Sequence, residues 1–296
     1  MIKAGAKRLL RHLGYEIHRI DAPVPSTSGL KNHHSQSDPT LIAPIWPLPR
    51  LSRFSDEEIR ATFSRYDLWH YAYEFEGGLS FPARHRNAGL LEEDPMRALQ
   101  RFSHLMPDLI ESQEGTLKGK RVLDMACNSG FWSFQCALLG AEVLGFDVRP
   151  ELIEQANLIK SVTGIKNAEF RVLDFWEMSP QTLGGKFDVV LNLGILYHLP
   201  KPLEVLERTQ SIARKTILLD TVVLPSESAL IKLTWEEPLD IRCANTTGVV
   251  AIPSKSSIEL LLRHLRFKHW FEIPIRTRDM PNDYLNSNRA SWLIEI

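Results

Sequence analysis

The sequence predicts an α/β fold in which helices cover both faces of a mostly parallel sheet. Three observations lead to this prediction. From residue 119 onward, short runs rich in β-branched residues alternate with helical stretches. Three of the predicted strands end at or beside an aspartate, and the last two predicted strands follow each other with no helix between them.

The predicted elements follow in order along the chain. The strands cover residues 120–125, 142–146, 169–173, 187–193 and 216–223, and the helices between them cover 130–139, 150–162 and 202–213. Because parallel strands need a long crossover connection, this alternation predicts parallel pairing. A helix over 256–265 then precedes strands 270–274 and 291–296, which we expect to pair antiparallel at the sheet edge. The result is a Rossmann-like seven-stranded sheet, mostly parallel, with an antiparallel C-terminal strand.

The chain before this sheet is predicted to form three segments. Residues 1–20 place leucines near helical spacing among lysines and arginines, which predicts an amphipathic basic helix resting on the protein itself, on a partner or on a membrane surface. Residues 21–53 are rich in proline and serine and are predicted to be a linker. Residues 54–116 are predicted to be a helical lid on the substrate side. Residues 117–296 form the main domain, with a cap insertion at 224–254.

Composition narrows the class of protein. The net charge of −1 gives no overall positive field for nucleic acid, although a local basic patch stays open. The three cysteines share no CxxC spacing, so we expect neither disulfides nor a metal site, and the cytoplasm is the default location. Because no run of about 18 apolar residues is present, we expect no membrane-spanning helix.

The turn after the first predicted strand has the residue types of a nucleotide-binding turn. Asp124 is followed by Ala126, Asn128 and Gly130, and a helix begins at once. Small residues let the backbone approach a ligand, and the N–H groups of a helix N-terminus are free to bind it. Asparagine tolerates positive φ, so the turn is feasible with one glycine. By itself the turn does not distinguish dinucleotide enzymes from other nucleotide-binding proteins.

Two further carboxylates indicate what this turn binds. Asp147 ends the second strand, 23 residues after Asp124, where its two oxygens can accept from both hydroxyls of a ribose. After the third strand, Asp174 can accept from an adenine amino group while Phe175 packs against the ring. Since the carboxyl ends of parallel strands meet at one edge, we expect all three acids to share one crevice.

This arrangement resembles that of class I S-adenosylmethionine-dependent methyltransferases. The resemblance implies S-adenosyl-L-methionine as the cofactor; no metal-binding residues are predicted, and a requirement for a divalent metal stays open. The residues that it would use to bind the cofactor are Asp124, Ala126, Asn128, Gly130, Phe131, Asp147, Val148, Asp174, Phe175, Asn192 and Gly194.

The end of the fourth strand is the predicted catalytic segment. Gly194 allows close approach to the methionine part of the cofactor, and Tyr197 and His198 then project near its sulfonium. An imidazole has suitable acidity to take the proton of a hydroxyl nucleophile, so we expect His198 to be the general base. The alternative is that His198 packs against, or caps, the following helix.

Residues 118–296 also resemble the bacterial tRNA wobble-uridine carboxymethyltransferase family. The likeness lies in the segment from Gly194 to His198, in Leu218–Val223, and in Ile252-Pro253-Ser254 followed by a leucine run. That family uses a carboxylated cofactor and needs cations beside the added carboxylate. Here Leu199-Pro200 replaces the arginines that follow the motif in the family, so we expect ordinary methyl transfer.

The substrate side is less defined by the sequence. The aromatic run containing Trp69 and Tyr73 is predicted either to stack a ring or sugar or to pack in the core, and Glu74 either meets a substrate group or lies on the surface. In the cap insertion, Trp235 is a further candidate for contact with the substrate. The favoured function is methylation of a small-molecule or sugar hydroxyl. A tRNA-modifying enzyme and a non-catalytic adaptor stay open as alternatives.

Overall fold

The computed structural model describes residues 41–84, 96–236 and 248–296. A single compact unit covers Pro39–Ile296, and a second unit, Met1–Asp38, lies outside the described residues. The predicted basic helix at 1–20 and most of the predicted linker therefore lie outside them too. Within the described ranges, no helix has the length and apolar character that a bilayer span requires.

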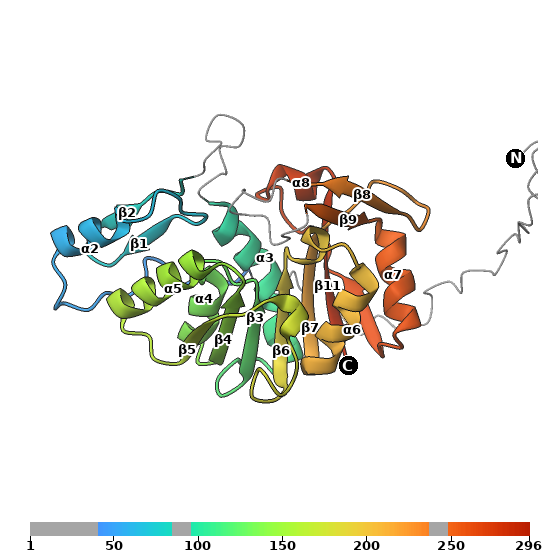
Figure 1. Cartoon of the computed structure of the whole chain (residues 1–296), viewed down its shortest axis with the longest axis horizontal. Coiled ribbons are helices and arrows are strands. Elements are labelled where there is room, and N and C mark those ends of the chain that lie inside the picture. Colours follow the sequence, from blue (N-terminus) through green and yellow to red (C-terminus); the bar gives the residue numbers. More distant parts are fainter. Residues whose placement is uncertain (1–40, 85–95, 237–247) are drawn as a thin grey trace, which may run out of the picture. The chain divides into compact units, whose positions relative to one another are not determined.

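Seven strands form the central sheet in the order β10-β11-β7-β6-β3-β4-β5 (Figure 1). They are β3 (Arg121–Met125), β4 (Glu142–Asp147), β5 (Ala168–Val172), β6 (Phe187–Leu193), β7 (Ala213–Val222), β10 (His269–Glu272) and β11 (Arg289–Glu295). The pairs from β5 to β7 are parallel, whereas β11 pairs antiparallel with β7 and β10. The predicted fold is thus confirmed. The strand order reverses at β3, and the carboxyl ends of its neighbours β4 and β6 therefore open a crevice there.

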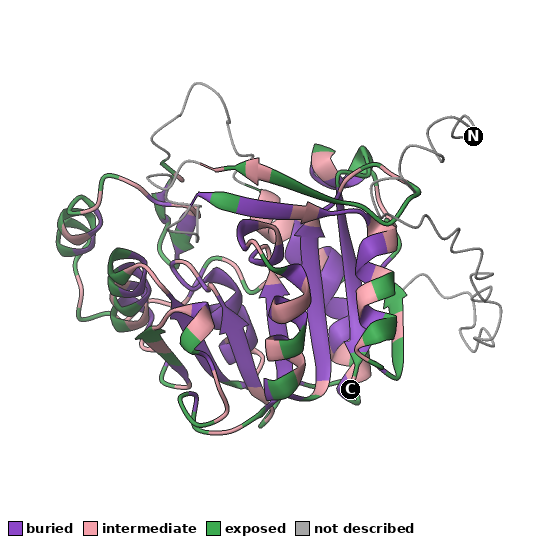
Figure 2. Ribbon diagram, turned by 45° about the vertical axis from the view of Figure 1, so that its right-hand side comes forward, coloured by how far each residue is buried: buried purple, intermediate pink, exposed green. Residues whose placement is uncertain are grey.

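Helices cover both faces of the sheet. The helices are α3 (Arg97–Ser112), α4 (Phe131–Leu138), α5 (Pro150–Thr163), α6 (Pro202–Ile212) and α7 (Lys255–His264). One apolar core lies under α3, α4 and α5 and includes Val122, and the other lies under α6 and α7 and includes Leu123. Neighbouring residues of a strand point to opposite faces, so the near-continuous apolar runs of the central strands fill both cores. Figure 2 shows these strands buried while the outer sides of the helices stay exposed.

The residues before the sheet pack into the first core. They form α2 (Asp56–Phe63), the antiparallel pair β1 (Tyr73–Phe75) and β2 (Leu79–Phe81), and the 16-residue helix α3. Ser55 and Glu58 cap α2 reciprocally, which satisfies N–H groups at its start. Because Phe63 and Phe75 belong to the same buried cluster as the sheet residues, residues 54–116 form part of the core in their described portion. None of them lines the pocket described below.

The described end of the predicted linker is ordered against the domain. Leu48 is 1% exposed and exchanges backbone hydrogen bonds with Glu74 and Glu76, next to β1. The Gln135 side chain of α4 holds Ile45 through both its N–H and its carbonyl, at 2.8 and 3.0 Å. Residues 41–53 therefore do not behave as a free linker, because Leu48 is buried in the domain and the backbone of Leu48 and Ile45 is hydrogen-bonded to β1 and α4.

The cap insertion is a two-stranded hairpin outside the main sheet. It consists of β8 (Ile231–Trp235) and β9 (Val249–Pro253), which pair antiparallel. A parallel bridge between Leu224 and Ser254 joins the two ends of the insertion. The Ala251 N–H donates to the Leu199 carbonyl at 3.2 Å, which holds β9 against the short helix η2 (Leu196–His198).

Candidate cofactor and acceptor site

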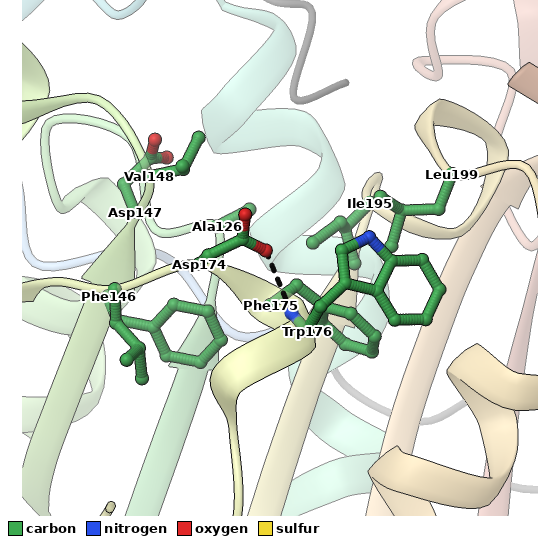
Figure 3. Close-up of a pocket in the computed structure, with 10 residues that line it drawn as sticks. Ala126, Phe146, Asp147, Val148, Asp174, Phe175, Trp176, Ile195 and Leu199 are labelled. Carbon is green, nitrogen blue, oxygen red and sulfur yellow. Dashed lines mark hydrogen bonds between the residues drawn. The ribbon is translucent and has the colours of Figure 1, made fainter. Parts of the chain in front are cut away.

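A pocket opens at the carboxyl ends of β4, β5 and β6 (Figure 3). Its lining residues are Ala126, Phe146, Asp147, Val148, Leu173, Asp174, Phe175, Trp176, Ile195 and Leu199. In Figure 3, Asp147 and Val148 lie at one end, Ile195 and Leu199 lie at the other, and Asp174 lies between them. Five predicted cofactor residues, Ala126, Asp147, Val148, Asp174 and Phe175, are thus brought together.

The turn between β3 and α4 has the left-handed backbone that a close approach to a ligand requires. Ala126, Asn128 and Gly130 have φ values of 53°, 52° and 89°. A Cβ atom at Gly130 would lie 2.9 Å from the rings of Phe134 and Phe170, so only glycine fits at this position without rearrangement. The Tyr73 hydroxyl donates to the Ser129 carbonyl at 2.8 Å and holds the turn in place.

Asp147 presents a largely buried carboxylate to the pocket. Its Oδ2 accepts from the Asn128 N–H and its Oδ1 from the Arg149 N–H, both at 3.1 Å. Burial raises its pKa, against the effect of these backbone N–H groups. Since each carboxylate oxygen accepts about two hydrogen bonds, both oxygens keep capacity for the hydroxyls of a ribose.

Asp174 and its neighbours form the middle of the pocket. The Asp174 Oδ1 accepts from the Trp176 N–H at 2.8 Å, which begins the short helix η1 (Phe175–Glu177). Phe175 and Trp176 pack edge to face with centroids 5.1 Å apart. A carboxylate beside an aromatic pair can accept from the amino group of adenine while the rings contact its face.

Four predicted cofactor residues lie behind the pocket and do not line it. Asp124 is 2% exposed and accepts from the Ser133 hydroxyl at 2.7 Å, and burial raises its pKa to about 7. Asn192 is fully buried and points toward Thr209 of α6, at 3.5 Å. Phe131 packs in the first core. Gly130 shapes the turn. The side chains of Asp124, Asn192 and Phe131 are enclosed by the protein itself, and their contact with the cofactor stays a prediction.

The remaining two predicted cofactor residues act through the backbone. Asn128 donates its N–H to Asp147, while its own Oδ1 accepts from the Ser129 N–H at 2.7 Å. Gly194 has a φ of 105°, and its N–H donates to the Asp220 carbonyl at 2.9 Å. Gly194 precedes Ile195, which lines the pocket.

Tyr197 and His198 lie on η2, between the lining residues Ile195 and Leu199. The His198 Nδ1 lies 2.6 Å from the Glu236 Oε2. The Tyr197 hydroxyl accepts from the Arg289 Nη2 at 3.3 Å, and the guanidinium lies 5.3 Å from the centre of the tyrosine ring. Each predicted catalytic residue therefore has a charged partner from a distant part of the chain.

A buried carboxylate near the end of β7, Asp220, gathers four side-chain donors. Asp220, at the end of β7, accepts from Arg101 at 2.7 Å, Arg289 at 2.6 Å, Ser291 at 2.7 Å and the Tyr284 hydroxyl at 2.5 Å. Although burial acts to raise its pKa, the two arginines and the two hydroxyls hold the pKa well below its usual range. We call this set, with Arg97 and Asp283, the Asp220 cluster.

The outer part of the Asp220 cluster connects α3 to β11. Arg97 binds both oxygens of Asp283, at 2.8 and 2.6 Å, and the Arg289 Nε donates to Asp283 at 2.8 Å. Burial acts to raise the pKa of Asp283, but these guanidinium groups lower it to about 2. The cluster therefore ties α3, β7, β11 and α8 (Asn282–Leu285) together beside Tyr197.

The predicted substrate residues have different positions. Trp69 is 1% exposed and stacked on Phe63 at 4.3 Å, and Tyr73 is completely buried, so both are core residues, as the packing alternative predicts. Glu74 accepts from the Trp46 indole at 3.1 Å on the surface. Trp235 is 67% exposed on β8. Since both rings are almost completely buried, contact of Trp69 and Tyr73 with a substrate stays an untested prediction.

Sequence reasoning missed Glu236 and Arg289 as partners of the catalytic segment. Glu236 is one of several charged residues of the cap, and it is 38 residues from His198. Arg289 is 92 residues from Tyr197. The one local signal was Asp220, which follows two leucines at a strand end as an acid in a buried strand. Among the described residues, no group of three or more His, Cys, Asp or Glu side chains could hold a metal ion.

Comparison with known proteins agrees with this geometry. Residues 116–255 match the family described as "Methyltransferase domain". The ubiquinone biosynthesis O-methyltransferase of Bordetella pertussis is 31% identical over 122 residues, which is 41% of this chain and 50% of that protein. The enzyme of the same name from Acinetobacter baumannii is 28% identical over 42% of this chain and 52% of that protein. The chain thus spans about half the length of the curated relatives that it matches.

A solved structure extends the similarity to most of the chain. The N-terminal domain of EvdMO1 with SAH bound superimposes with a TM-score of 0.64 at 23% identity, covering 83% of this chain and 98% of that one. This similarity supports a common fold that includes elements before the main sheet. Residues 116–255 thus match a methyltransferase domain, and the strand order and the pocket at the switch point agree with the class I S-adenosylmethionine-dependent fold.

Proposed function

We propose that this protein transfers the methyl group of S-adenosyl-L-methionine to a hydroxyl of a small-molecule or sugar acceptor. The observation that carries the proposal is the continuity of the pocket. Asp147 and Asp174 line one part of it, and Ile195 and Leu199, which flank Tyr197 and His198, line the other. One cavity thus joins groups suited to adenosine with the segment suited to proton removal.

The residues present fit the cofactor. Asp147 would hold the ribose hydroxyls, and Asp174 with Phe175 would hold the adenine. The positive φ values from Ala126 to Gly130 bring the backbone of the turn to the ligand. Methyl transfer is an in-line displacement, so the protein mainly aligns the acceptor and excludes water. His198 would take the proton of the acceptor hydroxyl.

The names of similar proteins support oxygen as the acceptor atom. The curated relatives are O-methyltransferases of ubiquinone biosynthesis. The EvdMO1 domain was also crystallised in the presence of SAH and D-fucose. We therefore favour a hydroxylated acceptor, with 6-deoxyhexoses as the first class to test and catechols as the second.

The test has two stages on the full chain. Calorimetry first measures binding of S-adenosylhomocysteine. S-adenosylmethionine with a deuterated methyl group is then supplied with panels of 6-deoxyhexoses and catechols, and mass spectrometry follows the label. We expect one labelled methyl on an acceptor oxygen, and loss of transfer with retained cofactor affinity in His198→Ala. Cofactor binding without transfer to any hydroxylated acceptor would contradict the proposal and favour the adaptor alternative.

One observation favours a second candidate, the tRNA wobble-uridine carboxymethyltransferase activity. The Arg289 guanidinium lies against Tyr197, which supplies the kind of cation that a carboxylated cofactor needs. Against this, Arg289 already binds Asp220 and Asp283, so its charge is compensated. Mass measurement of the ligand that copurifies with the protein separates the two candidates, because the carboxylated cofactor is heavier.

A further inference from the structure

The acceptor side contains a histidine–carboxylate pair contributed by two separate parts of the chain. His198 lies on η2, and Glu236 directly follows β8 in the cap hairpin. The Nδ1 of the imidazole and the Oε2 of the carboxylate are 2.6 Å apart, and the side chains are 9% and 25% exposed. This is shorter than an ordinary hydrogen bond between neutral groups and typical of a charge-assisted one.

The hairpin holds this carboxylate in place through the backbone. The Glu236 N–H donates to the Gly248 carbonyl at 2.7 Å, which extends the pairing of the two cap strands by one residue. On the other strand, the Ala251 N–H donates to the Leu199 carbonyl, next to His198. The cap therefore contacts the catalytic segment twice, once through a side chain and once through the main chain.

The contact with Glu236 determines which imidazole nitrogen of His198 carries the proton. A carboxylate accepts from an N–H, so Glu236 favours the tautomer with its proton on Nδ1 and leaves a lone pair on Nε2. Among the described residues no hydrogen bond to Nε2 occurs. A carboxylate at Nδ1 also stabilises the positive charge that develops when Nε2 takes a proton, as in hydrolase triads.

We propose that Glu236 is a positioning residue that fixes the tautomer and orientation of His198. The cap hairpin thus contributes the carboxylate that orients the base. This inference rests on the proposed function. When bound, the cofactor supplies a methyl group: its carbon–sulfur bond breaks with the electron pair left on sulfur, and the oxygen–carbon bond forms. The hydroxyl proton goes to the His198 Nε2. Glu236 touches neither the acceptor nor the cofactor in this scheme.

The experiment is a double-mutant cycle on the full chain, with the acceptor identified as above. We expect Glu236→Ala to lower kcat about 100-fold, within the range that a positioned acid or base supplies. The acceptor KM and the affinity for S-adenosylhomocysteine should change less than about 3-fold, because the variant removes no contact with the acceptor or the cofactor. Glu236→Gln should recover about ten-fold of the loss, because its amide oxygen still accepts from Nδ1–H.

The double variant separates positioning from simple packing. If Glu236 acts through His198, the variant with both residues changed to alanine should be no slower than His198→Ala alone. Glu204→Ala, which removes a half-exposed carboxylate paired with Lys201 and Arg208 near η2, is the matched control and should keep full turnover. Additive losses, or equal changes in kcat, KM and cofactor affinity, would overturn the positioning role.

A spectroscopic readout does not depend on turnover. Nitrogen-15 spectra of histidine-labelled protein, with the His198 signals assigned by comparison with His198→Asn, should report a proton on Nδ1. In Glu236→Ala the proton should be distributed to Nε2. An unchanged tautomer would refute the inference even where transfer fails. Conversely, full transfer by His198→Ala would refute His198 as the base in the proposed function, which is a separate outcome.

Discussion

Two aspartates at the same edge of the sheet differ in how the protein compensates their burial. Asp124 near the end of β3 and Asp220 near the end of β7 both follow a leucine, and they are 2% and 0% exposed. Asp124 has a single side-chain partner, the Ser133 hydroxyl. Asp220 accepts from two guanidinium groups and two hydroxyls.

The consequence is a pKa shift in opposite directions. Burial raises the pKa of Asp124 to about 7, and the nearby Asp147 carboxylate acts in the same sense. For Asp220, burial is outweighed by Arg101 and Arg289, and the pKa is lowered. The comparison teaches that the two halves of this edge are built differently. In the half that we propose for the cofactor, the cofactor half, Asp124 has a neutral partner, whereas in the half that we propose for the acceptor, the acceptor half, Asp220 is cross-linked by two guanidinium groups.

The largest expected effect is on stability, from breaking the acceptor half. Asp220→Ala leaves Arg101 buried without a counter-ion and leaves Arg289 with Asp283 alone, which costs about 3–5 kcal/mol of unfolding free energy. Urea denaturation followed by circular dichroism measures it. Glu169→Ala, which breaks the exposed pair with Arg171, should change stability by less than about 0.5 kcal/mol. A loss below about 1 kcal/mol in Asp220→Ala would show that the cluster does not cross-link this half.

The second prediction tests the opposite directions of the two pKa shifts through the pH dependence of stability. Because the pKa of Asp124 is raised in the folded state, its contribution to the free energy of unfolding is fully present below pH ~4 and is lost as the pH rises through about 7. Asp124→Asn removes this loss. Its stability relative to the parent protein should therefore increase by roughly 2–3 kcal/mol between pH 5 and pH 8. Urea denaturation of both proteins at pH 5 and pH 8 measures this difference in stability. A difference that stays constant between the two pH values would mean that Asp124 ionises normally.

The third prediction separates the carboxylates within the cofactor half. Asp147→Ala should weaken binding of S-adenosylhomocysteine about 10–100-fold, since two hydrogen bonds to a charged acceptor are lost. Its stability should also fall by about 1–3 kcal/mol, because the Asn128 and Arg149 N–H groups lose their acceptor. Asp124→Asn is the control, because Asp124 does not line the pocket, and its affinity should stay within about 3-fold. Calorimetry measures both. Equal losses in the two variants would contradict the assignment of Asp147 to the ligand.

The smallest expected effect tests the turn of the cofactor half. Gly130 and Gly115 have φ values of 89° and 83°, but only Gly130 has rings at 2.9 Å from an added Cβ. Gly115→Ala should cost about 1 kcal/mol from backbone strain alone. Gly130→Ala should cost about 1–2 kcal/mol more, because Phe134 and Phe170 must move. Thermal unfolding of the two variants gives the difference, and equal losses would show that the space around Gly130 adapts.

Local patterns predicted the sheet well. The β-branched runs and the helical spacing are each contained in a few neighbouring residues, so the alternation of strands and helices and the antiparallel edge followed. The prediction that no helix separates the last two strands is wrong, because the short helix α8 lies between β10 and β11. The pocket residues Asp147, Asp174 and Phe175 also followed, because the ends of parallel strands converge regardless of the details of packing.

The unpredicted features depend on contacts between distant segments. Nothing near His198 indicates that Glu236 approaches it, and nothing near Tyr197 indicates Arg289. Which way a side chain faces was equally hidden. Asp124 points into the protein toward Ser133, although its sequence position is like that of Asp147. Trp69 is an aromatic residue of the kind that lines sugar sites, and only its packing against Phe63 identifies it as core.

The joined ends of the cap have a consequence for protein engineering. The insertion leaves the main sheet at Leu224 and returns at Ser254, where the two residues bridge, and its strands pair only with each other. A segment with adjacent ends outside the main sheet can be exchanged for the corresponding segment of a relative without breaking the register of the seven strands. Under the proposed function, such grafting is expected to alter acceptor preference. Because Glu236 belongs to the exchanged segment, the positioning role that we propose for it predicts a slower catalyst from any graft without an acid at that place.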